Sequence, residues 1–196
     1  MNFQIFQMNN LQRAGLAPSV EYDGRDDALL LNDAAHRMPF VFCDGGRAAA
    51  GYRGKTGDCT CRAIAIATGR DYQTVCSEIN LLAQTERLTK RRAKRSRACT
   101  GVHKPTTRRY LLSLGWRWVP TMFIGQGCKV HLRTGELPNG TLIVAVSHHL
   151  VAVLDGTIYD THDCSRGGTR CVYGYFVYDD GQQSSVSSAE DRGMPP

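Results

Sequence analysis

Hydrophobic and polar positions divide the chain into a helical part followed by a strand-forming part. The run between Asp58 and Gly69 is apolar on all sides, with a helix-capping residue before it and a helix-ending glycine after it, which predicts a buried helix. A second amphipathic helix is expected after Asp71, and a third, opened by Pro105, is expected over 106–114.

From Trp116 onward the pattern is that of strands. An Asp155-Gly156 dipeptide predicts a two-residue hairpin turn that pairs Leu154 with Thr157. Helices followed by an antiparallel sheet indicate an α+β fold in which the N-terminal helices pack on the sheet. The expected strands are Met38–Cys43, Trp116–Val119, Lys129–Arg133, Thr141–Ser147, His148–Leu154, Thr157–Asp160 and Val172–Tyr178.

The chain divides into three parts. Residues 38–178 form the expected folded domain, whereas residues 1–37 give only weak helical signals and are interpreted as a partly helical or disordered extension. Residues 179–196 are rich in Ser, Gln and acid without periodicity, which predicts a disordered tail. No apolar run reaches the roughly 20 residues of a membrane span, and the N-terminus lacks the pattern of a secretory signal, so we expect a cytoplasmic protein without membrane partners.

Eight cysteines are too few, in a chain of 196 residues with a large apolar fraction, to indicate a disulfide-stapled fold. Most are therefore expected to be reduced thiols. A structural zinc site is an alternative, for which Cys99 with His103 and Cys128 with His131 are the best-spaced pairs. Because no Cys-x-x-Cys pair is present, the preferred interpretation has no metal and no cofactor.

The positive charge is concentrated in one segment. Residues 87–109 carry ten Lys and Arg and no acid, and without them the net charge of +6 would be −4. Such a run is ordinarily a solvated surface, but it is dense enough to contact several phosphates or an acidic protein. No aromatic residues are interleaved to stack on bases. The residues of this predicted patch are Arg91, Arg92, Lys94, Arg95 and Arg97.

Cys59 is the first residue after the predicted cap Asp58. The unpaired amides of a helix N-terminus favour a thiolate over a thiol, so Cys59 is a candidate nucleophile. The hairpin register places His149 and Asp160 on one sheet face as diagonal neighbours, where a carboxylate can hold the second imidazole nitrogen. We therefore predict a Cys59–His149–Asp160 triad.

The same hairpin register also allows a second histidine–aspartate pair to serve as the base and its orienting carboxylate. His148 and Asp163 lie on the opposite face, directly opposed, and form the alternative base and orienting carboxylate. The first pair is preferred because Val151 and Val153 continue its face inward, whereas Asp163 lies beyond the expected strand end.

The segment Gly57–Gly69, together with His149–Thr161, resembles small papain-like cysteine peptidase-type proteins of bacteria and phages. The similarity extends from about Val41 to Tyr178. It implies a papain-like core in which Cys59 is the nucleophile, His149 the general base and acid, and Asp160 the orienting residue. The implied activity is acyl transfer on a protein or peptide substrate, at a peptide or isopeptide bond.

One position departs from the papain pattern. Where papain-like enzymes place an oxyanion-hole glutamine, this chain has Arg53, so Tyr52, Lys55 or backbone amides are expected to substitute, with Asp58 as a supporting residue. The alternative function is a non-catalytic papain-like module that binds nucleic acid or an acidic partner through residues 87–109.

Overall fold

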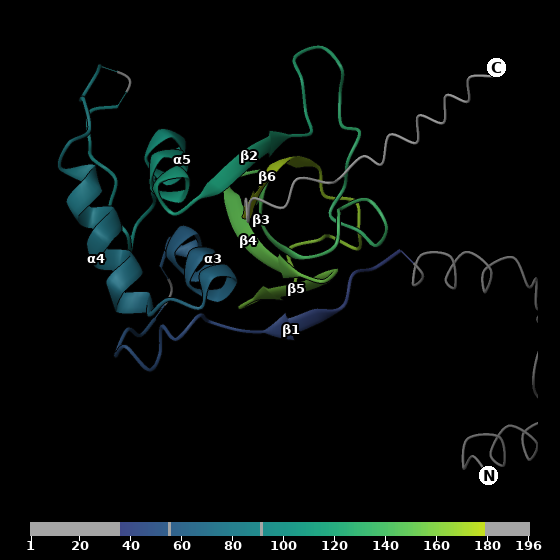
Figure 1. Ribbon diagram of the computed structural model, residues 1–196, viewed down its shortest axis with the longest axis horizontal. Coiled ribbons are helices and arrows are strands. Elements are labelled where there is room, and N and C mark those ends of the chain that lie inside the picture. Colours follow the sequence, from purple (N-terminus) through teal and green to yellow (C-terminus); the bar gives the residue numbers. More distant parts are fainter. Residues whose placement is uncertain (1–35, 55, 91, 179–196) are drawn as a thin grey trace, which may run out of the picture. The chain divides into compact units, whose positions relative to one another are not determined.

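A computed structural model describes residues 36–54, 56–90 and 92–178, which form an α+β structure of three helices and a six-stranded sheet (Figure 1). The predicted tail, and the predicted extension up to residue 35, lie outside the described residues. The helices are α3 (Cys59–Thr68), α4 (Tyr72–Ala83) and α5 (Lys104–Ser113). The strands are β1 (Phe40–Phe42), β2 (Trp116–Pro120), β3 (Thr141–Val146), β4 (His149–Leu154), β5 (Thr157–Asp160) and β6 (Val172–Tyr178). No helix in these ranges has the length and apolar character needed to cross a membrane.

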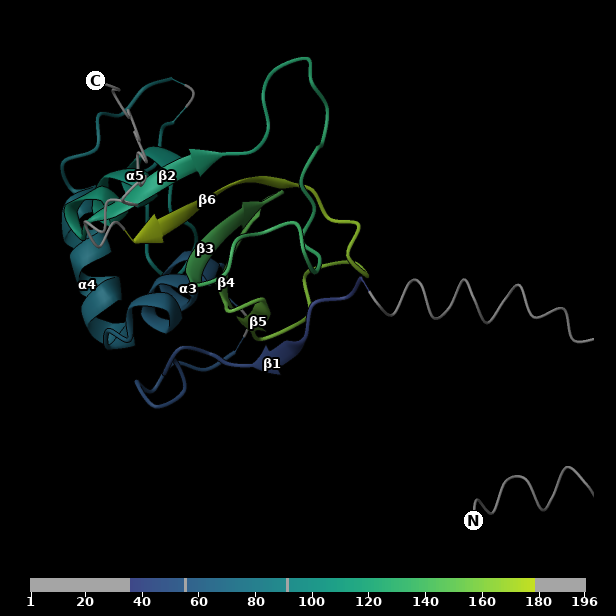
Figure 2. The same ribbon diagram turned by 45° about the vertical axis from the view of Figure 1, so that its right-hand side comes forward.

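The sheet is mixed, with the strand order β1-β5-β4-β3-β6-β2 (Figures 1 and 2). β1 runs parallel to β5, and all other neighbouring strands are antiparallel. The prediction of a purely antiparallel sheet is therefore wrong at this edge. A parallel pair requires a long crossover, and here the whole helical region lies between the two paired strands in the sequence.

The β4–β5 hairpin has the predicted register. Leu154 pairs with Thr157, and the pairing continues inward from there. Asp155 and Gly156 both have positive φ angles, of 44° and 75°, as the tight turn between two twisted strands requires. This register determines which strand residues face α3.

The three helices lie together on one side of the sheet (Figures 1 and 2), and α3 packs mainly against β4. As predicted, α3 is largely buried and ends at Gly69 in the left-handed conformation. Asp71 caps α4 by accepting a hydrogen bond from the Thr74 amide at 2.8 Å.

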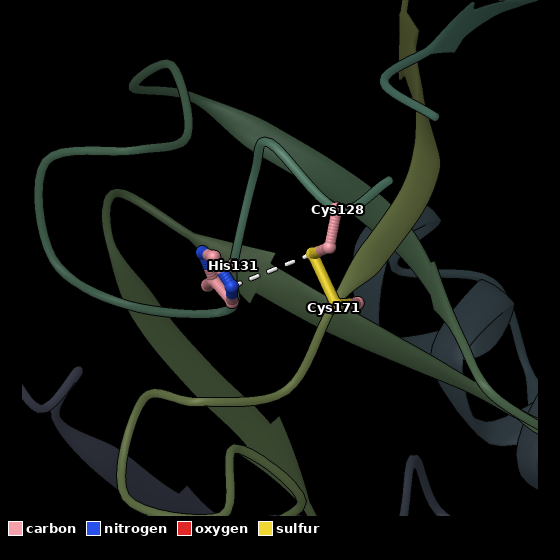
Figure 3. A group of neighbouring side chains, drawn as sticks. All are labelled: Cys128, His131 and Cys171. Carbon is pink, nitrogen blue, oxygen red and sulfur yellow. Dashed lines mark hydrogen bonds between the residues drawn. A yellow bond between two sulfur atoms is a disulfide. The ribbon is translucent and has the colours of Figure 1, made fainter. Parts of the chain in front are cut away.

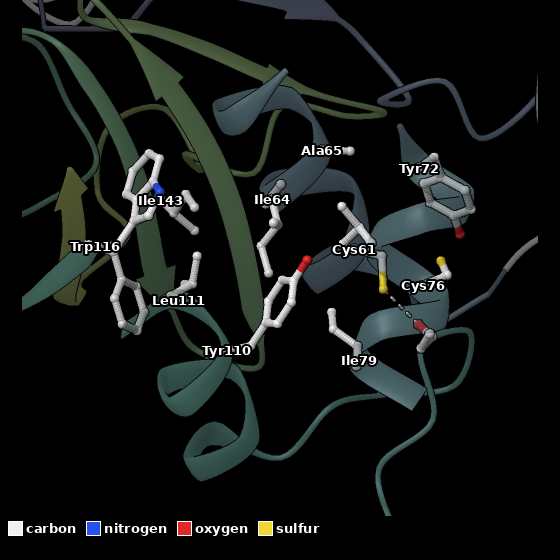
Figure 4. Close-up of a cluster of buried hydrophobic side chains, with 14 residues drawn as sticks. Cys61, Ile64, Ala65, Tyr72, Cys76, Ile79, Tyr110, Leu111, Trp116 and Ile143 are labelled. Carbon is white, nitrogen blue, oxygen red and sulfur yellow. Dashed lines mark hydrogen bonds between the residues drawn. The ribbon is translucent and has the colours of Figure 1, made fainter. Parts of the chain in front are cut away.

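Alternate residues of the strands point to opposite faces of the sheet and supply two hydrophobic cores. The core beneath the helices includes Cys61, Ile64, Ile79, Leu111 and Ile143 (Figure 4).

The second core lies on the opposite face of the sheet, beneath the connection between β2 and β3. Leu132 of this connection is fully buried there, but residues 129–133 do not form the predicted strand. Val130 and Leu132, the alternate apolar residues of this stretch, both pack on the second core. However, β6 is already paired with β2 and β3, so only an isolated bridge from His131 to Cys171 remains.

Six cysteines are free thiols, in agreement with the sequence prediction, but Cys128 and Cys171 form a disulfide that was not predicted. The two residues are separated by 43 positions and lie, respectively, in the β2–β3 connection and just before β6. Nothing local in the sequence indicates this contact, since it depends on how the connection folds back over the sheet.

Candidate active site

Cys59 occupies the first position of α3, and its half-buried side chain lines the same pocket as His149. The helix begins there because Asp58 stands at the N-cap position, although its side chain makes no capping hydrogen bond. The predicted capping role of the Asp58 side chain is therefore wrong. The sulfur of Cys59 nevertheless lies at a helix N-terminus, whose partial positive charge stabilises a thiolate.

His149 and Asp160 are brought together as predicted. His149 opens β4 and Asp160 ends β5, and the distance from His149 Nε2 to Asp160 Oδ2 is 2.5 Å. Asp160 is buried, with 3% of its surface exposed. Because Nε2 is engaged by the carboxylate, Nδ1 is the ring nitrogen available to Cys59.

The local electrostatics favour an ion pair between sulfur and imidazole. Burial on its own raises the pKa of the Cys59 thiol, but the hydrogen bond to His149 and the imidazolium charge outweigh burial and hold that pKa below its ordinary value. Burial lowers the pKa of His149, whereas hydrogen bonds to Asp160, Cys164 and Cys59 raise it to about 11. The pKa of Asp160 is lowered, since the bond to His149 overcomes the opposing effect of burial. At neutral pH these shifts keep His149 as an imidazolium and Asp160 as a carboxylate, and they favour the thiolate form of Cys59 relative to an ordinary thiol.

Arg62 is a site residue that the sequence reasoning missed. It lies one turn along α3, forms an ion pair with Asp58, and places its other terminal nitrogen 3.2 Å from Asp160 Oδ1. Arg62 therefore joins the helix that carries Cys59 to the carboxylate that holds His149. The sequence did contain a signal for Arg62: it is the single charged residue in an otherwise apolar predicted helix. An arginine is rarely buried without a charged partner, so a buried ion pair could have been expected there.

Asp58 belongs to this buried ionic network rather than to the pocket. Besides Arg62, it contacts Arg47 Nε at 2.7 Å and accepts a hydrogen bond from the Tyr72 hydroxyl at 2.6 Å. These contacts fix the start of α3, so Asp58 supports the site by anchoring the helix.

A pocket of about 770 Å³ exposes both Cys59 and His149. Its walls combine apolar and aromatic surface, including Trp118, with the basic side chains of Lys104 and Arg108. Among the described residues, no acidic side chain lines this pocket. The pocket is therefore large enough for a sizeable ligand to reach the sulfur and the imidazole. Its lining is mostly apolar, and the charged side chains in it are basic.

The other predicted site residues lie elsewhere. The Tyr52 hydroxyl donates to Gln73 Oε1 at 2.8 Å, and Tyr52 is not among the residues that line the pocket. Lys55 lies outside the described residues. His148 is exposed and lines the pocket, whereas Asp163 accepts a hydrogen bond from the Ser165 amide at 2.8 Å. Within the described ranges, no hydrogen bond joins the two members of this alternative pair.

Two clusters have the composition of metal sites. One includes His149, Asp160 and His162, whose ligand atoms all lie within 4.8 Å of one another, and thus shares two residues with the predicted triad. The other consists of Cys128, His131 and Cys171. Cys99 and His103, the other pair considered for zinc, are not members of either cluster.

The basic segment follows α4 and leads into α5. Arg92, Lys94, Arg95 and Arg97 are exposed, and Arg91 lies outside the described residues. The carbonyl of Lys94 lies 2.9 Å from His103 Nε2, and the segment then continues along the pocket wall. The predicted patch is thus on the surface, close in sequence to residues that line the pocket.

Comparisons with known protein families, with curated proteins and with solved structures found no match to this chain.

Proposed function

We propose that this protein is a cysteine hydrolase with a papain-like core, which cleaves peptide or isopeptide bonds by acyl transfer. The observation that carries the proposal is the contact from His149 Nε2 to Asp160 at 2.5 Å, in a pocket that His149 lines together with Cys59 at the start of α3. A thiol paired with an imidazole that a carboxylate orients is the arrangement of an activated nucleophile.

In the acylation step the Cys59 thiolate attacks the substrate carbonyl carbon, forming a carbon–sulfur bond and an oxyanion. Backbone amides at the N-terminus of α3 are placed to stabilise that oxyanion. The His149 imidazolium then gives its proton to the leaving amine as the carbon–nitrogen bond breaks. Water, deprotonated by His149, attacks the thioester, releases the carboxylic acid and restores the thiolate.

Asp160 and Arg62 have positioning roles in this mechanism. The Asp160 carboxylate holds Nε2, which leaves Nδ1 as the ring nitrogen that exchanges the proton with the sulfur and the substrate. Arg62 in turn holds Asp160 from α3 at 3.2 Å, which keeps the helix and the hairpin in one register. Proton transfer requires this geometry, since a candidate base must lie within hydrogen-bonding reach of the proton that it takes.

The pocket favours a substrate that carries negative charge beside an apolar group. Lys104 and Arg108 line it without an acidic neighbour, and Trp118 supplies flat apolar surface. Lys104 Nζ lies 5.4 Å from the ring centroid of Tyr173, so its charge is held over the aromatic part of the wall. An acidic peptide fits this lining better than a basic one.

The test is the pH dependence of iodoacetamide alkylation in the native, reduced protein, with the modified cysteine located by peptide mapping. The proposed ion pair with His149, which agrees with the lowered pKa of Cys59, should keep the thiolate populated as the pH falls below 7, where an ordinary thiol is protonated. At pH 5.5 an ordinary thiol is only about one part in 10³ ionised. We therefore expect Cys59 to react at least 10²-fold faster there than Cys43, a free thiol that follows β1 and does not line the pocket.

His149→Ala should remove this advantage, because the imidazolium that stabilises the thiolate is lost. Peptide-library turnover should disappear in Cys59→Ala and remain in Cys43→Ser. Equal low-pH reactivity of Cys59 and Cys43 would contradict the proposal, as would turnover that survives Cys59→Ala.

A non-catalytic binding module is the second candidate function, favoured by the exposure of Arg92, Lys94, Arg95 and Arg97. Binding of an acidic protein or nucleic acid through this surface should weaken steeply with salt. It should also weaken in Arg92→Glu/Arg95→Glu but not in Cys59→Ala. Salt-dependent retention together with an unreactive Cys59 would favour this function over the hydrolase.

A further inference from the structure

The cluster of Cys128, His131 and Cys171 lies on the face of the sheet opposite the helices, away from the predicted triad (Figures 2 and 3). The backbone holds its members together independently of the disulfide. His131 and Cys171 form a β-bridge, and the Val172 amide donates to the Val130 carbonyl at 2.8 Å. Reduction of the disulfide would therefore leave the two sulfurs and the imidazole side by side.

His131 is oriented by a carboxylate on the side away from the sulfurs. Glu136 Oε2 lies 3.2 Å from His131 Nδ1 and also accepts the His131 backbone amide at 2.5 Å. A hydrogen bond from Nδ1 to this carboxylate requires the ring proton on Nδ1. The lone pair of Nε2 is then directed at Cys128 Sγ, 3.4 Å away.

The disulfide leaves this lone pair without a partner, because a disulfide sulfur has no proton to donate. In zinc sites the ligating histidine commonly donates its other ring N–H to a carboxylate, which fixes the tautomer and raises the basicity of the ligating nitrogen. With zinc–sulfur bonds near 2.3 Å and zinc–nitrogen bonds near 2.0 Å, a tetrahedral ion separates sulfur from nitrogen by about 3.5 Å. The sulfur-to-nitrogen distance at Cys128 is already close to this value.

We propose that, in the reduced protein, Cys128, Cys171 and His131 bind a zinc ion, with water as the fourth ligand. Two thiolates and a neutral imidazole are soft ligands that suit Zn²⁺, and two thiolates balance its charge. All three side chains are half-buried, so the fourth coordination position has access to solvent. Glu136 is the positioning residue of the site.

The disulfide and the metal site are alternative states of the same two sulfurs. A phosphine reductant supplies two electrons to the disulfide, is oxidised to phosphine oxide by taking up water oxygen, and leaves two thiols. Zinc binding then forms two zinc–sulfur bonds and releases both thiol protons. The metal would take over the cross-link between the β2–β3 connection and β6.

The experiment uses the full-length Cys59→Ala variant, so that the sulfur of the predicted triad does not contribute ligands. The protein is reduced with a phosphine, stripped with a chelator, loaded with zinc, desalted and assayed by elemental mass spectrometry. We expect about one equivalent of zinc, and we expect Co²⁺ loading to give thiolate-to-cobalt charge-transfer absorption. Proton release on zinc addition should accompany binding.

Replacement of either sulfur, in Cys128→Ser or Cys171→Ser, should abolish tight binding and weaken the thiolate-to-cobalt absorption. Glu136→Gln keeps both sulfurs and the imidazole, and should weaken zinc affinity about 10- to 100-fold. Cys43→Ser and His162→Ala are matched controls expected to bind as the parent does. His162 tests the other cluster, which lies beside the triad.

The proposal is overturned if the reduced protein retains less than about a tenth of an equivalent of zinc, because the cluster is then a structural disulfide alone. It is also overturned if zinc is retained when both sulfurs are replaced. Neither result bears on the hydrolase, since alkylation of Cys59 is measured separately and the metal experiment omits its sulfur.

Discussion

Two regions of this molecule combine a cysteine, a histidine and a carboxylate, and they differ in what surrounds the sulfur. In one, His149 Nε2 is held by Asp160, and His149 lines a pocket together with Cys59. In the other, His131 Nδ1 lies 3.2 Å from a carboxylate oxygen of Glu136, and His131 Nε2 lies 3.4 Å from Cys128 Sγ. The residue types are nearly the same in the two regions, so composition alone does not distinguish them.

The surroundings decide the chemistry that each group can perform. Cys59 begins a helix, is a free thiol and faces a pocket, so it is suited to attack a bound carbonyl. Cys128 lies in an irregular connection next to a second cysteine, so it is suited to a cross-link, either covalent or metal-bound. The comparison teaches that the residue types alone do not predict the role: the helix N-terminus and the accessible pocket are what distinguish the group at Cys59, and they are the reason that catalysis is proposed there.

The largest effect on stability is expected from Arg62→Met, which tests whether the Cys59 region depends on its buried ionic network. The change leaves Asp58 and Asp160 buried without Arg62, and removal of one partner from a buried ion pair costs about 3–5 kcal/mol. The free energy of unfolding would be measured by urea titration, with unchanged m-values as the criterion for comparing the variants.

Arg70→Met is the matched control for this loss. A single guanidinium nitrogen of Arg70 donates to both carboxylate oxygens of Glu78, and the two side chains are 36% and 40% exposed, so we expect the variant to lose less than about 1 kcal/mol of stability. Equal losses in the two variants would show that the buried network contributes no more than a surface ion pair. The Cys59 region would then not differ from the rest of the molecule in this respect.

An intermediate effect is expected from reducing the Cys128–Cys171 disulfide in the presence of a chelator. Loss of a cross-link between residues 43 positions apart should lower the free energy of unfolding by about 2–4 kcal/mol. Low-pH alkylation of Cys59 should stay unchanged, because the two regions share no residue. Urea midpoints with and without a phosphine would measure the stability, and peptide mapping would measure the alkylation.

The Cys128→Ser/Cys171→Ser variant serves as the control, since its urea midpoint should not respond to the phosphine. A fall in Cys59 reactivity on reduction of the native disulfide would contradict the separation of the two regions. It would indicate that the cross-link also maintains the geometry of the pocket.

The sequence alone was sufficient to predict those features of the structure that depend on local signals. The start and end of α3 follow from a run between Asp58 and Gly69, and the β4–β5 register follows from Asp155-Gly156. The hairpin alone brings His149 and Asp160 together. The contact between His149 and Asp160 could therefore be predicted, because it needs only a turn type and the two-residue period of a strand.

The sequence alone was not sufficient to predict those features that depend on contacts between residues far apart in the chain. The parallel pairing of β1 with β5 and the failure of 129–133 to form a strand depend on which sheet edges remain open. The disulfide depends on how the β2–β3 connection folds back to Cys171. Arg62 lies between these cases, because its presence in an apolar helix was visible but its contact with Asp160 was not.

The smallest effect is expected from Tyr52→Phe, which sharpens the description of the Cys59 region by testing a proposed oxyanion donor. The Tyr52 hydroxyl donates to Gln73 at 2.8 Å, and Tyr52 does not line the pocket. Loss of this exposed hydrogen bond should cost no more than about 1 kcal/mol of stability. Peptide turnover should stay within about 2-fold, whereas loss of a true oxyanion donor costs roughly 10²–10³-fold in kcat.

Gln73→Ala is the control, because it removes the acceptor and leaves the Tyr52 ring in place. If Tyr52→Phe lost more than about 10²-fold in kcat while Gln73→Ala did not, the hydroxyl would have to leave Gln73 and reach the pocket when substrate binds. Unchanged turnover in both variants would instead leave the backbone amides of α3 as the oxyanion donors. The helix N-terminus, which the region around Cys128 lacks, would then supply both the thiolate stabilisation and the oxyanion hole.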